Sequence, residues 1–263
     1  MPAVVSVRLT VLGKSPSWQD LDGACSGYLI DVGERSLLVD CGSGVFAKLR
    51  RHGADERIEA VVISHFHADH VLDVVPFAYA LKYGPLASRT RPALHVPPGG
   101  RDALRRLCGS WGSETLVEDA FTVAEYAPAA GLAVAGAQLR FRPLPHYVTS
   151  NAIEIRADGS QARLVYSADC GPNDLLAPFA RGAQVLLIES TMLDPDPQGV
   201  GTDEPSGHLT AAQAGEIGRE AGVERLVLTH YSDQLDRDAL RARAEETFGR
   251  GVEFASEGGV YEV

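Results

Sequence analysis

The sequence predicts an α/β fold in which helices cover the faces of β-sheets. Strand-like segments come first and are joined by a short turn, which indicates a sheet at the start of the chain. In both halves of the chain, apolar runs rich in β-branched residues alternate with helical segments. No short-period repeat, low-complexity segment or long polar linker interrupts the pattern, so we expect a single domain over residues 1–263.

The first half of the chain supplies four strands and three helices. The expected strands cover residues 5–12, 26–32, 36–40 and 60–64, and the expected helices cover residues 42–52, 71–83 and about 101–108. Gly33-Glu34 separates the second and third strands and is typical of a hairpin turn. Residues 60–64 are mainly apolar and β-branched, which indicates a buried strand.

The second half repeats the theme. The expected strands cover residues 138–143, 152–157, 163–167, 185–189 and 225–229. A helix over residues 210–220 precedes the last strand, because Thr210 and Gln213 have capping-box spacing and Gly222 ends the segment. A final helix is expected over residues 236–248, before Gly249. Strands with helices in both halves predict a layered sandwich, although the number and order of its sheets do not follow from the pattern.

The net charge limits the classes of partner. The chain has 263 residues and a formal net charge of −11, so it offers no basic field for a phosphate backbone. We therefore expect no stable nucleic-acid complex. A small anionic substrate is compatible with this charge, because bound metal ions would invert the charge locally.

Cysteine usage and hydropathy indicate the compartment. The four cysteines show no C-x-x-C spacing and are too sparse for a disulfide framework, so we interpret them as reduced thiols. Residues 1–13 lack a basic n-region and carry Arg8 within the apolar stretch, which favours a strand over a signal peptide. No apolar run reaches the ~18 residues of a membrane span. We expect a cytoplasmic protein without membrane association, and a homodimer is one assembly that the sequence leaves open.

The most informative stretch is residues 61–70, where an apolar strand leads into His65, His67, Asp69 and His70. His65 and His67 are two positions apart, so on extended backbone they point the same way and can share one metal ion. Asp69 and His70 come where the chain turns into a helix and can reach a neighbouring point. Imidazole and carboxylate ligands together suit zinc, manganese or iron. A lone histidine is usually structural, but four ligand-type side chains in six positions need a reason to crowd together.

This stretch resembles the signature motif of the metallo-β-lactamase superfamily. The other motifs of that family are also present, in the order in which the family has them. They are Asp40 after Leu37-Leu38-Val39, His146 after Leu144-Pro145, Asp169 in Tyr166-Ser167-Ala168-Asp169, and His230 after Leu226-Val227-Leu228-Thr229. The resemblance covers residues 40–230. It implies an αββα four-layer sandwich with the metal site at the edge between two mixed sheets.

The resemblance also implies a site with two divalent metal ions, zinc first, with manganese or iron as alternatives. One ion would be held by His65, His67 and His146, and the other by Asp69, His70 and His230. Asp169 would bridge them, and Asp40 would support the ligands without binding metal.

Each outlying motif has a structural alternative when taken alone. Asp40 and Asp169 could be turn residues, and His146 and His230 could be ordinary loop or surface histidines. Cys170 adjoins the bridging position, where true β-lactamases tend to carry a cysteine ligand. The Y-S-x-D pattern favours Asp169, and the neighbouring position stays open. His52 and His95 match no motif and receive no role.

Two further segments resemble the ribonuclease Z-like branch of the superfamily. Glu189-Ser190-Thr191 resembles its glutamate motif, and Gly207-His208-Leu209-Thr210 resembles its His-x-Thr motif. The resemblance implies that His208 protonates the leaving oxygen while Glu189 orients and charges it. The structural alternatives are an exposed acid at a strand end and a histidine at a helix start.

One departure from that branch bears on the substrate. Ribonucleases of the branch insert a long Gly/Pro-rich arm that grips transfer RNA between the third and fourth motifs. Here His146 and Asp169 are 23 positions apart, which leaves room for two strands and a turn. The missing arm and the acidic balance favour a smaller phosphodiester. Residues 5–13, 25–29 and 261–263 resemble bacterial cyclic-nucleotide phosphodiesterases of this branch, more weakly than the metal motif resembles its family.

We therefore predict a dinuclear metal-dependent phosphodiesterase for a small phosphodiester such as a cyclic nucleotide, with Asp69, His208 and Glu189 as catalytic residues. The alternatives on the same fold are a ribonuclease Z-like RNA 3′-end endonuclease and a thioester, lactone or β-lactam hydrolase. An amidohydrolase-type barrel is disfavoured by the early hairpins and by Asp69-His70. A non-catalytic scaffold would need a degenerate ligand set, and no ligand is missing.

Overall fold

The computed structural model describes residues 6–194 and 206–263, and its strands form two mixed sheets. The first sheet has the order β14-β1-β2-β3-β4-β5-β6. Its strands are β1 (Val7–Gly13), β2 (Gly27–Val32), β3 (Arg35–Val39), β4 (Ile58–Val62), β5 (Ala93–Val96), β6 (Thr122–Glu125) and β14 (Val260–Glu262). Strands β14, β1, β2 and β3 pair antiparallel, and β3 to β6 pair parallel.

The second sheet has the order β13-β12-β11-β10-β9-β8-β7. Its strands are β7 (Leu132–Val134), β8 (Ala137–Leu144), β9 (Ser150–Ala157), β10 (Leu164–Tyr166), β11 (Val185–Glu189), β12 (Arg225–Thr229) and β13 (Glu253–Phe254). Strands β7 to β10 pair antiparallel, and β10 to β13 pair parallel. Each sheet therefore joins three antiparallel strand pairs to three parallel pairs.

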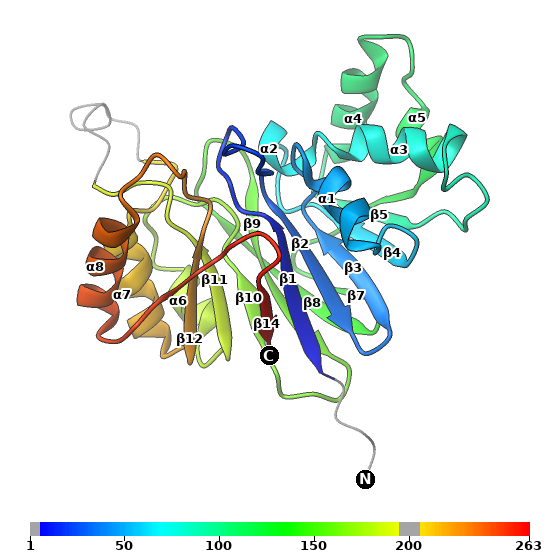
Figure 1. Ribbon diagram of the computed structural model, residues 1–263. Helices are drawn as coiled ribbons and strands as arrows, with labels where there is room; N and C mark the ends of the chain where they lie inside the picture. The colour runs from blue at the N-terminus through cyan, green and yellow to red at the C-terminus, as the bar shows by residue number, and fades with distance from the viewer. Residues whose placement is uncertain (1–5, 195–205) are drawn as a thin grey trace.

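Helices cover the outer face of each sheet (Figure 1). The helices with the first sheet are α1 (Val45–His52), α2 (Ala68–Val71), α3 (Val74–Tyr83), α4 (Gly100–Gly109) and α5 (Leu116–Ala120). Those with the second sheet are α6 (Leu176–Ala180), α7 (Ala211–Ala221) and α8 (Arg237–Phe248). The expected αββα sandwich is confirmed. None of the helices in the described part of the chain is long and apolar enough to cross a membrane.

Alternating side chains build three apolar cores. Leu9, Ile30 and Val62 of the first sheet meet Ile155 and Leu187 of the second in the core between the sheets. Residues of the opposite strand faces pack under the helices in two outer cores. Most central strands are thus buried on both faces, which explains why they read as continuous apolar runs and not as a strict alternation.

The topology gathers the carboxyl ends of several strands at one edge. Strands β3 and β4 run parallel, as do β10, β11 and β12, and β8 runs in the same direction as β10 because both are antiparallel to β9. Three residues that follow these strands, Asp40, Ala168 and His230, have φ angles of 57°, 51° and 54°. The left-handed conformation costs non-glycine residues about 1–3 kcal/mol each and tends to occur at functional sites.

Most expected elements are present, with shifted boundaries. The Gly33-Glu34 turn, the Thr210–Gln213 capping box and the Gly222 end of α7 are confirmed. The helix expected over residues 71–83 is wrong in part, because α2 ends at Val71 and α3 starts at Val74. The carboxylate of Asp73 in the break accepts a hydrogen bond from the N–H of Phe46 at 2.9 Å. Residue 5 of the first expected strand lies outside the described residues. The structure adds seven elements that the sequence pattern did not predict: β5, β6, β7, β13, β14, α5 and α6.

Candidate metal centre

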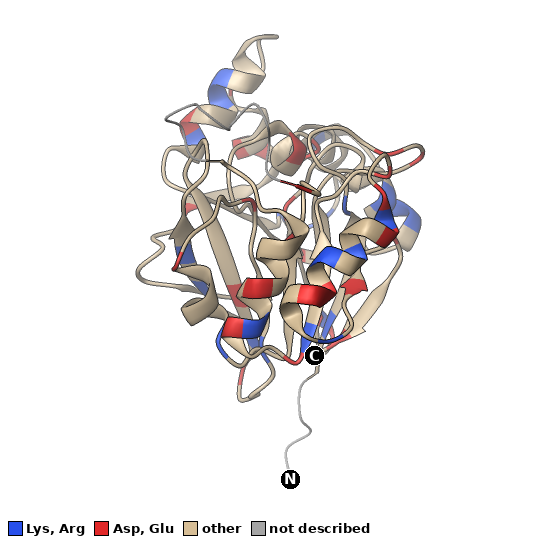
Figure 2. Cartoon of the chain, turned by 90° about the vertical axis from the view of Figure 1, so that its left-hand side faces the viewer, with Lys and Arg blue, Asp and Glu red and all other residues tan. Residues whose placement is uncertain are grey.

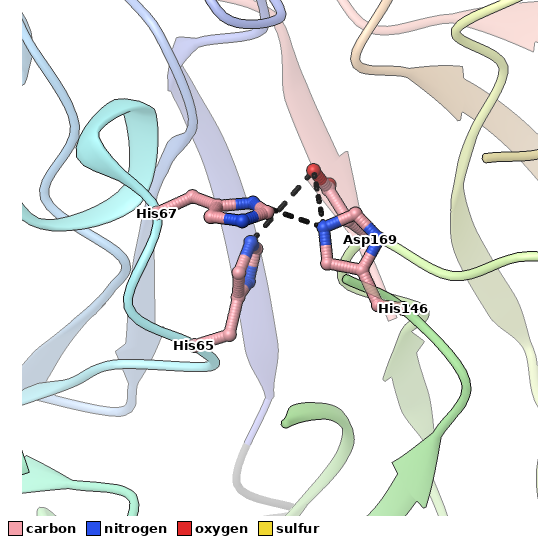
Figure 3. A group of neighbouring side chains, drawn as sticks. All are labelled: His65, His67, His146 and Asp169. Carbon is pink, nitrogen blue, oxygen red and sulfur yellow. Dashed lines mark hydrogen bonds and ion pairs between the residues drawn. The ribbon is translucent and has the colours of Figure 1, made fainter. Parts of the chain in front are cut away.

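His65, His67, His146 and Asp169 form the first group of ligand-type side chains at the shared strand edge. His65 and His67 lie between β4 and α2, His146 follows β8, and Asp169 follows β10. Figure 3 shows the four side chains pointing toward one another. The ring nitrogens His67 Nδ1 and His146 Nε2 are 3.0 Å apart. Asp169 Oδ2 lies 3.8 Å from His65 Nε2 and 3.9 Å from His146 Nε2.

Asp69, His70, Asp169 and His230 form the second group, and all four are buried. Asp69 and His70 lie in α2, and His230 follows β12. Asp169 Oδ2 is 3.3 Å from the Nε2 atoms of both His70 and His230. Asp69 Oδ2 is 3.5 Å from His70 Nε2 and 3.2 Å from His230 Nε2. Asp169 is common to both groups, which is the position that a bridging carboxylate requires.

Unpartnered polar atoms test whether these residues suit a cation. His65 Nε2, His70 Nε2 and Asp169 Oδ1 are buried and have no hydrogen-bond partner. Leaving a buried polar atom unsatisfied costs about 1–3 kcal/mol, and these three atoms belong to neighbouring residues of the two groups. A cation bound by these atoms would remove that cost, and imidazole with carboxylate is a donor set that binds zinc, manganese or iron. The residues therefore fit the metal pair that the sequence predicts.

In four of the histidines, the Nδ1 atom points away from the centre and has a hydrogen-bond partner in the protein. The pairs are His65 Nδ1 with Ser64 Oγ at 3.0 Å, His70 Nδ1 with Asp40 Oδ2 at 2.8 Å, His146 Nδ1 with the Gly207 carbonyl at 2.7 Å, and His230 Nδ1 with Thr191 Oγ1 at 2.8 Å. A carbonyl or a carboxylate can only accept, so Nδ1 of His70 and His146 carries the proton. Nε2 is then left to face the centre, as in metal sites whose ligands are oriented by an outer partner.

Asp40 lies behind the second group and does not face the centre. Its Oδ2 accepts hydrogen bonds from the Ser64 hydroxyl at 2.8 Å, the Tyr166 hydroxyl at 3.0 Å and His70 Nδ1 at 2.8 Å. Its Oδ1 accepts from the Ser64 N–H at 2.7 Å. Asp40 thus contacts His70 from outside both groups, and its supporting role stays a prediction. The sequence pattern missed Ser64 and Tyr166, because hydroxyl residues are too common to stand out.

Electrostatics favour the ligand form of His65 and Asp169, but they favour the protonated form of His70. Burial, with smaller contributions from neighbouring histidines, holds the pKa of His65 well below its usual value, so its ring is neutral. Burial opposes the ionisation of Asp169, but His230, His70 and His65 outweigh it and hold the pKa of that carboxyl well below its usual range. Burial also opposes the charge on His70, but Asp169 and Asp40 raise its pKa well above the usual value. A cation would therefore compete with a proton at His70 Nε2.

Glu189 and His208 pair directly beside the metal centre. His208 Nδ1 lies 3.2 Å from both carboxylate oxygens of Glu189. Burial alone would lower the pKa of His208, but its hydrogen bond to Glu189 and the charge of that carboxylate raise it to about 9. His208 is therefore an imidazolium at neutral pH. Glu189 is buried at the end of β11, so it is not the exposed acid of the structural alternative.

The position next to Asp169 turns away from the metal centre. Cys170 is packed in the core under α6 and α7, and burial raises the pKa of its thiol well above the usual value. Its N–H donates to Glu189 Oε1 at 2.6 Å. Of the two adjacent positions, Asp169 faces both groups and Cys170 faces neither.

Tyr147 and a small apolar pocket lie beside the two groups, whereas His52 and His95 lie apart from them. The ring of Tyr147 lies 5.1 Å from that of His146 and 5.9 Å from that of His208, and its side chain is exposed. A pocket of about 170 Å³ beside the first group is lined mainly by apolar residues: Phe66, Pro97, Pro98, Gly99, Gly100, Ala103, Val148 and Thr149. His52 is exposed in α1, and His95 is in β5, so neither joins the cluster.

The family described as Beta-lactamase superfamily domain matches residues 35–231. The chain is 33% identical to the probable metallo-hydrolase YhfI of Bacillus subtilis (strain 168), over 97% of this chain and 100% of that protein. The crystal structure of YhfI superposes with a TM-score of 0.86, covering 98% of this chain and 100% of the other. A ribonuclease Z of Bradyrhizobium sp. (strain ORS 278) is 29% identical over 92% of this chain and 95% of its own. The short form of human tRNase Z, 21% identical, shares the fold with a TM-score of 0.73 over 97% of this chain and 98% of its own.

Proposed function

The chain belongs to the metallo-β-lactamase superfamily as a metallo-hydrolase, and from that premise we propose that it is a dinuclear phosphodiesterase for a small phosphodiester such as a cyclic nucleotide. The observation that carries the proposal is the Glu189–His208 pair. It sets an imidazolium, 3.2 Å from a buried carboxylate, next to the two groups of ligand-type side chains.

That imidazolium is useful for one kind of leaving group. An alkoxide leaving from phosphorus is strongly basic and needs a proton as the bond breaks, whereas a thiolate leaves without one. A positioned acid accelerates such a step by about 10²–10⁴-fold. The pair therefore supports a phosphodiester substrate over a thioester.

We assign His65, His67 and His146 to one divalent ion and Asp69, His70 and His230 to the other, with Asp169 shared. Zinc is our first choice of metal, with manganese or iron as alternatives. When bound, such ions polarise a phosphoryl oxygen and lower the pKa of water so that it attacks at neutral pH.

Two of the chain's own residues handle protons. The pKa of Asp69 is lowered, because His230 and His70 outweigh the effect of burial, so its carboxylate is ionised and able to orient the attacking water and accept its proton. His208 gives its proton to the leaving oxygen as the P–O bond breaks, and Glu189 holds the imidazolium in place. One water is consumed, and the new P–O bond replaces the one that is lost.

Two observations favour a small substrate. Strands β9 and β10, with the short segment that joins them, occupy most of the chain between His146 and Asp169, so no RNA-gripping arm is inserted there. In the view of Figure 2, segments with basic residues and segments with acidic residues alternate along the helices, and the whole chain carries a formal net charge of −11. The likeness to a ribonuclease Z keeps an RNA 3′-end endonuclease as the second candidate.

A substrate panel tests the proposal on the zinc-loaded protein. It compares 2′,3′- and 3′,5′-cyclic nucleotides, bis-(p-nitrophenyl) phosphate, a thioester, a β-lactam and a transfer-RNA precursor. We expect cleavage of the small phosphodiesters, its loss in Asp169→Asn, and its retention in His52→Ala, which changes a histidine outside the cluster. Turnover of the thioester or β-lactam with no phosphodiester cleaved would contradict the proposal. Preferred cleavage of the RNA would replace it with the second candidate.

A further inference from the structure

Thr191 lies between the metal centre and the Glu189–His208 pair and contacts both. Its Oγ1 donates a hydrogen bond to Glu189 Oε2 at 2.6 Å. The same Oγ1 lies 2.8 Å from Nδ1 of His230 and 3.4 Å from Nδ1 of His208. One hydroxyl therefore joins the carboxylate of the acid pair to a histidine of the second metal group.

The direction of these hydrogen bonds follows from their chemistry. A threonine hydroxyl has one proton, and a carboxylate can only accept, so that proton goes to Glu189. Thr191 must then accept from His230, which fixes the proton of the His230 ring on Nδ1. Nε2 of His230 keeps its lone pair, and it faces Asp69 at 3.2 Å and Asp169 at 3.3 Å.

The same hydroxyl completes the surroundings of Glu189. Glu189 Oε1 accepts the N–H of Cys170 at 2.6 Å, and Oε2 accepts the N–H of Leu209 at 3.1 Å. Each oxygen thus accepts one hydrogen bond from a backbone N–H. In the described chain, Thr191 supplies the only side-chain hydroxyl that is bonded to this carboxylate. This orients the carboxylate so that both oxygens are equally distant from His208 Nδ1.

We propose that Thr191 is a positioning residue for both centres. Through His230 it presents a lone pair to the second metal ion, and through Glu189 it holds the carboxylate that orients His208. The second half of this inference rests on the proposed phosphodiesterase function, whereas the first half concerns metal binding alone.

The chain offers matched variants for a test. Thr191→Val removes the hydroxyl and keeps the branched shape, Thr191→Ala removes both, and Thr191→Ser keeps the hydroxyl. Ser190→Ala is the control, because the hydroxyl of Ser190 is buried one position away and has no hydrogen-bond partner. Thermal unfolding of each zinc-loaded variant identifies those that are folded, and Thr191→Ala carries the test if Thr191→Val does not fold.

The first measurement is zinc retention by the loaded protein against increasing chelator. We expect Thr191→Val and Thr191→Ala to lose one of two zinc ions at about 10–100-fold lower chelator strength, the usual effect of removing a partner that orients a ligand. Thr191→Ser and Ser190→Ala should match the wild type. Wild-type retention in both hydroxyl-free variants, or equal loss in Thr191→Ser, would overturn the metal half.

The second measurement is the ratio of kcat on an alkyl phosphodiester to kcat on bis-(p-nitrophenyl) phosphate. We expect the ratio to fall in Thr191→Val, to be restored in Thr191→Ser, and to change little when Thr191→Val is added to His208→Ala. An unchanged ratio in Thr191→Val would overturn the catalytic half. If the wild type cleaves no phosphodiester, the proposed function fails and the zinc measurement still decides the metal half.

Discussion

Replacing Asp40 by Asn isolates the support behind the second metal group. Asparagine tolerates the positive φ of this position, and its amide has nearly the shape of the carboxylate. The buried carboxylate accepts four hydrogen bonds, three at Oδ2 and one at Oδ1. In the variant the amide oxygen can keep the three bonds at the Oδ2 position, while the NH₂ group meets the N–H of Ser64 as a second donor.

The expected loss follows from that count. Hydrogen bonds to a charged group contribute about 1.5–3 kcal/mol each and neutral ones about 0.5–1.5 kcal/mol. Three bonds that become neutral therefore lose about 3 kcal/mol together, and an orphaned N–H adds about 1–3 kcal/mol. We expect Asp40→Asn to lower the free energy of unfolding by about 4–6 kcal/mol. Zinc retention should also weaken by about 10–100-fold, because His70 loses its orienting partner.

Urea unfolding of chelator-treated protein measures the stability change without a metal contribution, and the chelator titration measures zinc retention. Asp22→Asn is the matched control, since Asp22 has a φ of 58° but lies on the surface. A loss no larger than that of Asp22→Asn, with unchanged zinc retention, would refute the supporting role of Asp40.

Three further predictions concern the metal pair and the acid. Elemental analysis after zinc reconstitution should give about two ions per chain, fewer in Asp169→Asn, and a value near zero in the wild type would remove the metal centre from the proposal. Cleavage of alkyl phosphodiesters should fall as the pH rises through about 9, because His208 is protonated below its raised pKa and loses that proton above it. Cleavage of nitrophenyl esters should not fall in this pH range. A fall shared by both kinds of substrate would mean that a group other than His208 titrates there. Glu189→Gln should lower alkyl ester cleavage, and combining it with His208→Ala should add little to the single loss, as for residues that act as a unit. Additive losses would mean that the two residues act separately.

The candidate ligands came from the resemblance to the superfamily motifs, and the structure brings them together in two groups. His65, His67, His146, Asp169 and His230 each come within a few residues of a strand end, and parallel strands bring those ends to one edge of the fold. The direct Glu189–His208 contact was not predictable, since it depends on how the segment before α7 lies against β11. Thr191 was visible only as part of a motif. Its role depends on a hydroxyl proton and on the orientation of two rings.

The undetected fold elements have different causes. Strands β6 and β7 are short and only partly buried, so they lack a long apolar run. Strand β14 pairs with β1, and β13 pairs with β12, so the end of the chain contributes one strand to each sheet. Pairing between such distant segments is decided by tertiary packing, which local periodicity does not report. The break between α2 and α3 depends similarly on the contact of Asp73 with α1.

The most direct test of the central claim is the dependence of kcat on the leaving group in His208→Ala. A series of phosphodiesters from alkyl to nitrophenyl leaving groups is compared in zinc-loaded wild type and variant of equal metal content. We predict a loss of about 10²–10⁴-fold for alkoxide leaving groups, the usual contribution of a positioned acid, and a small loss for nitrophenolate, which leaves without a proton. Equal losses across the series would contradict the acid role, and loss of metal in the variant would show that His208 is a ligand instead.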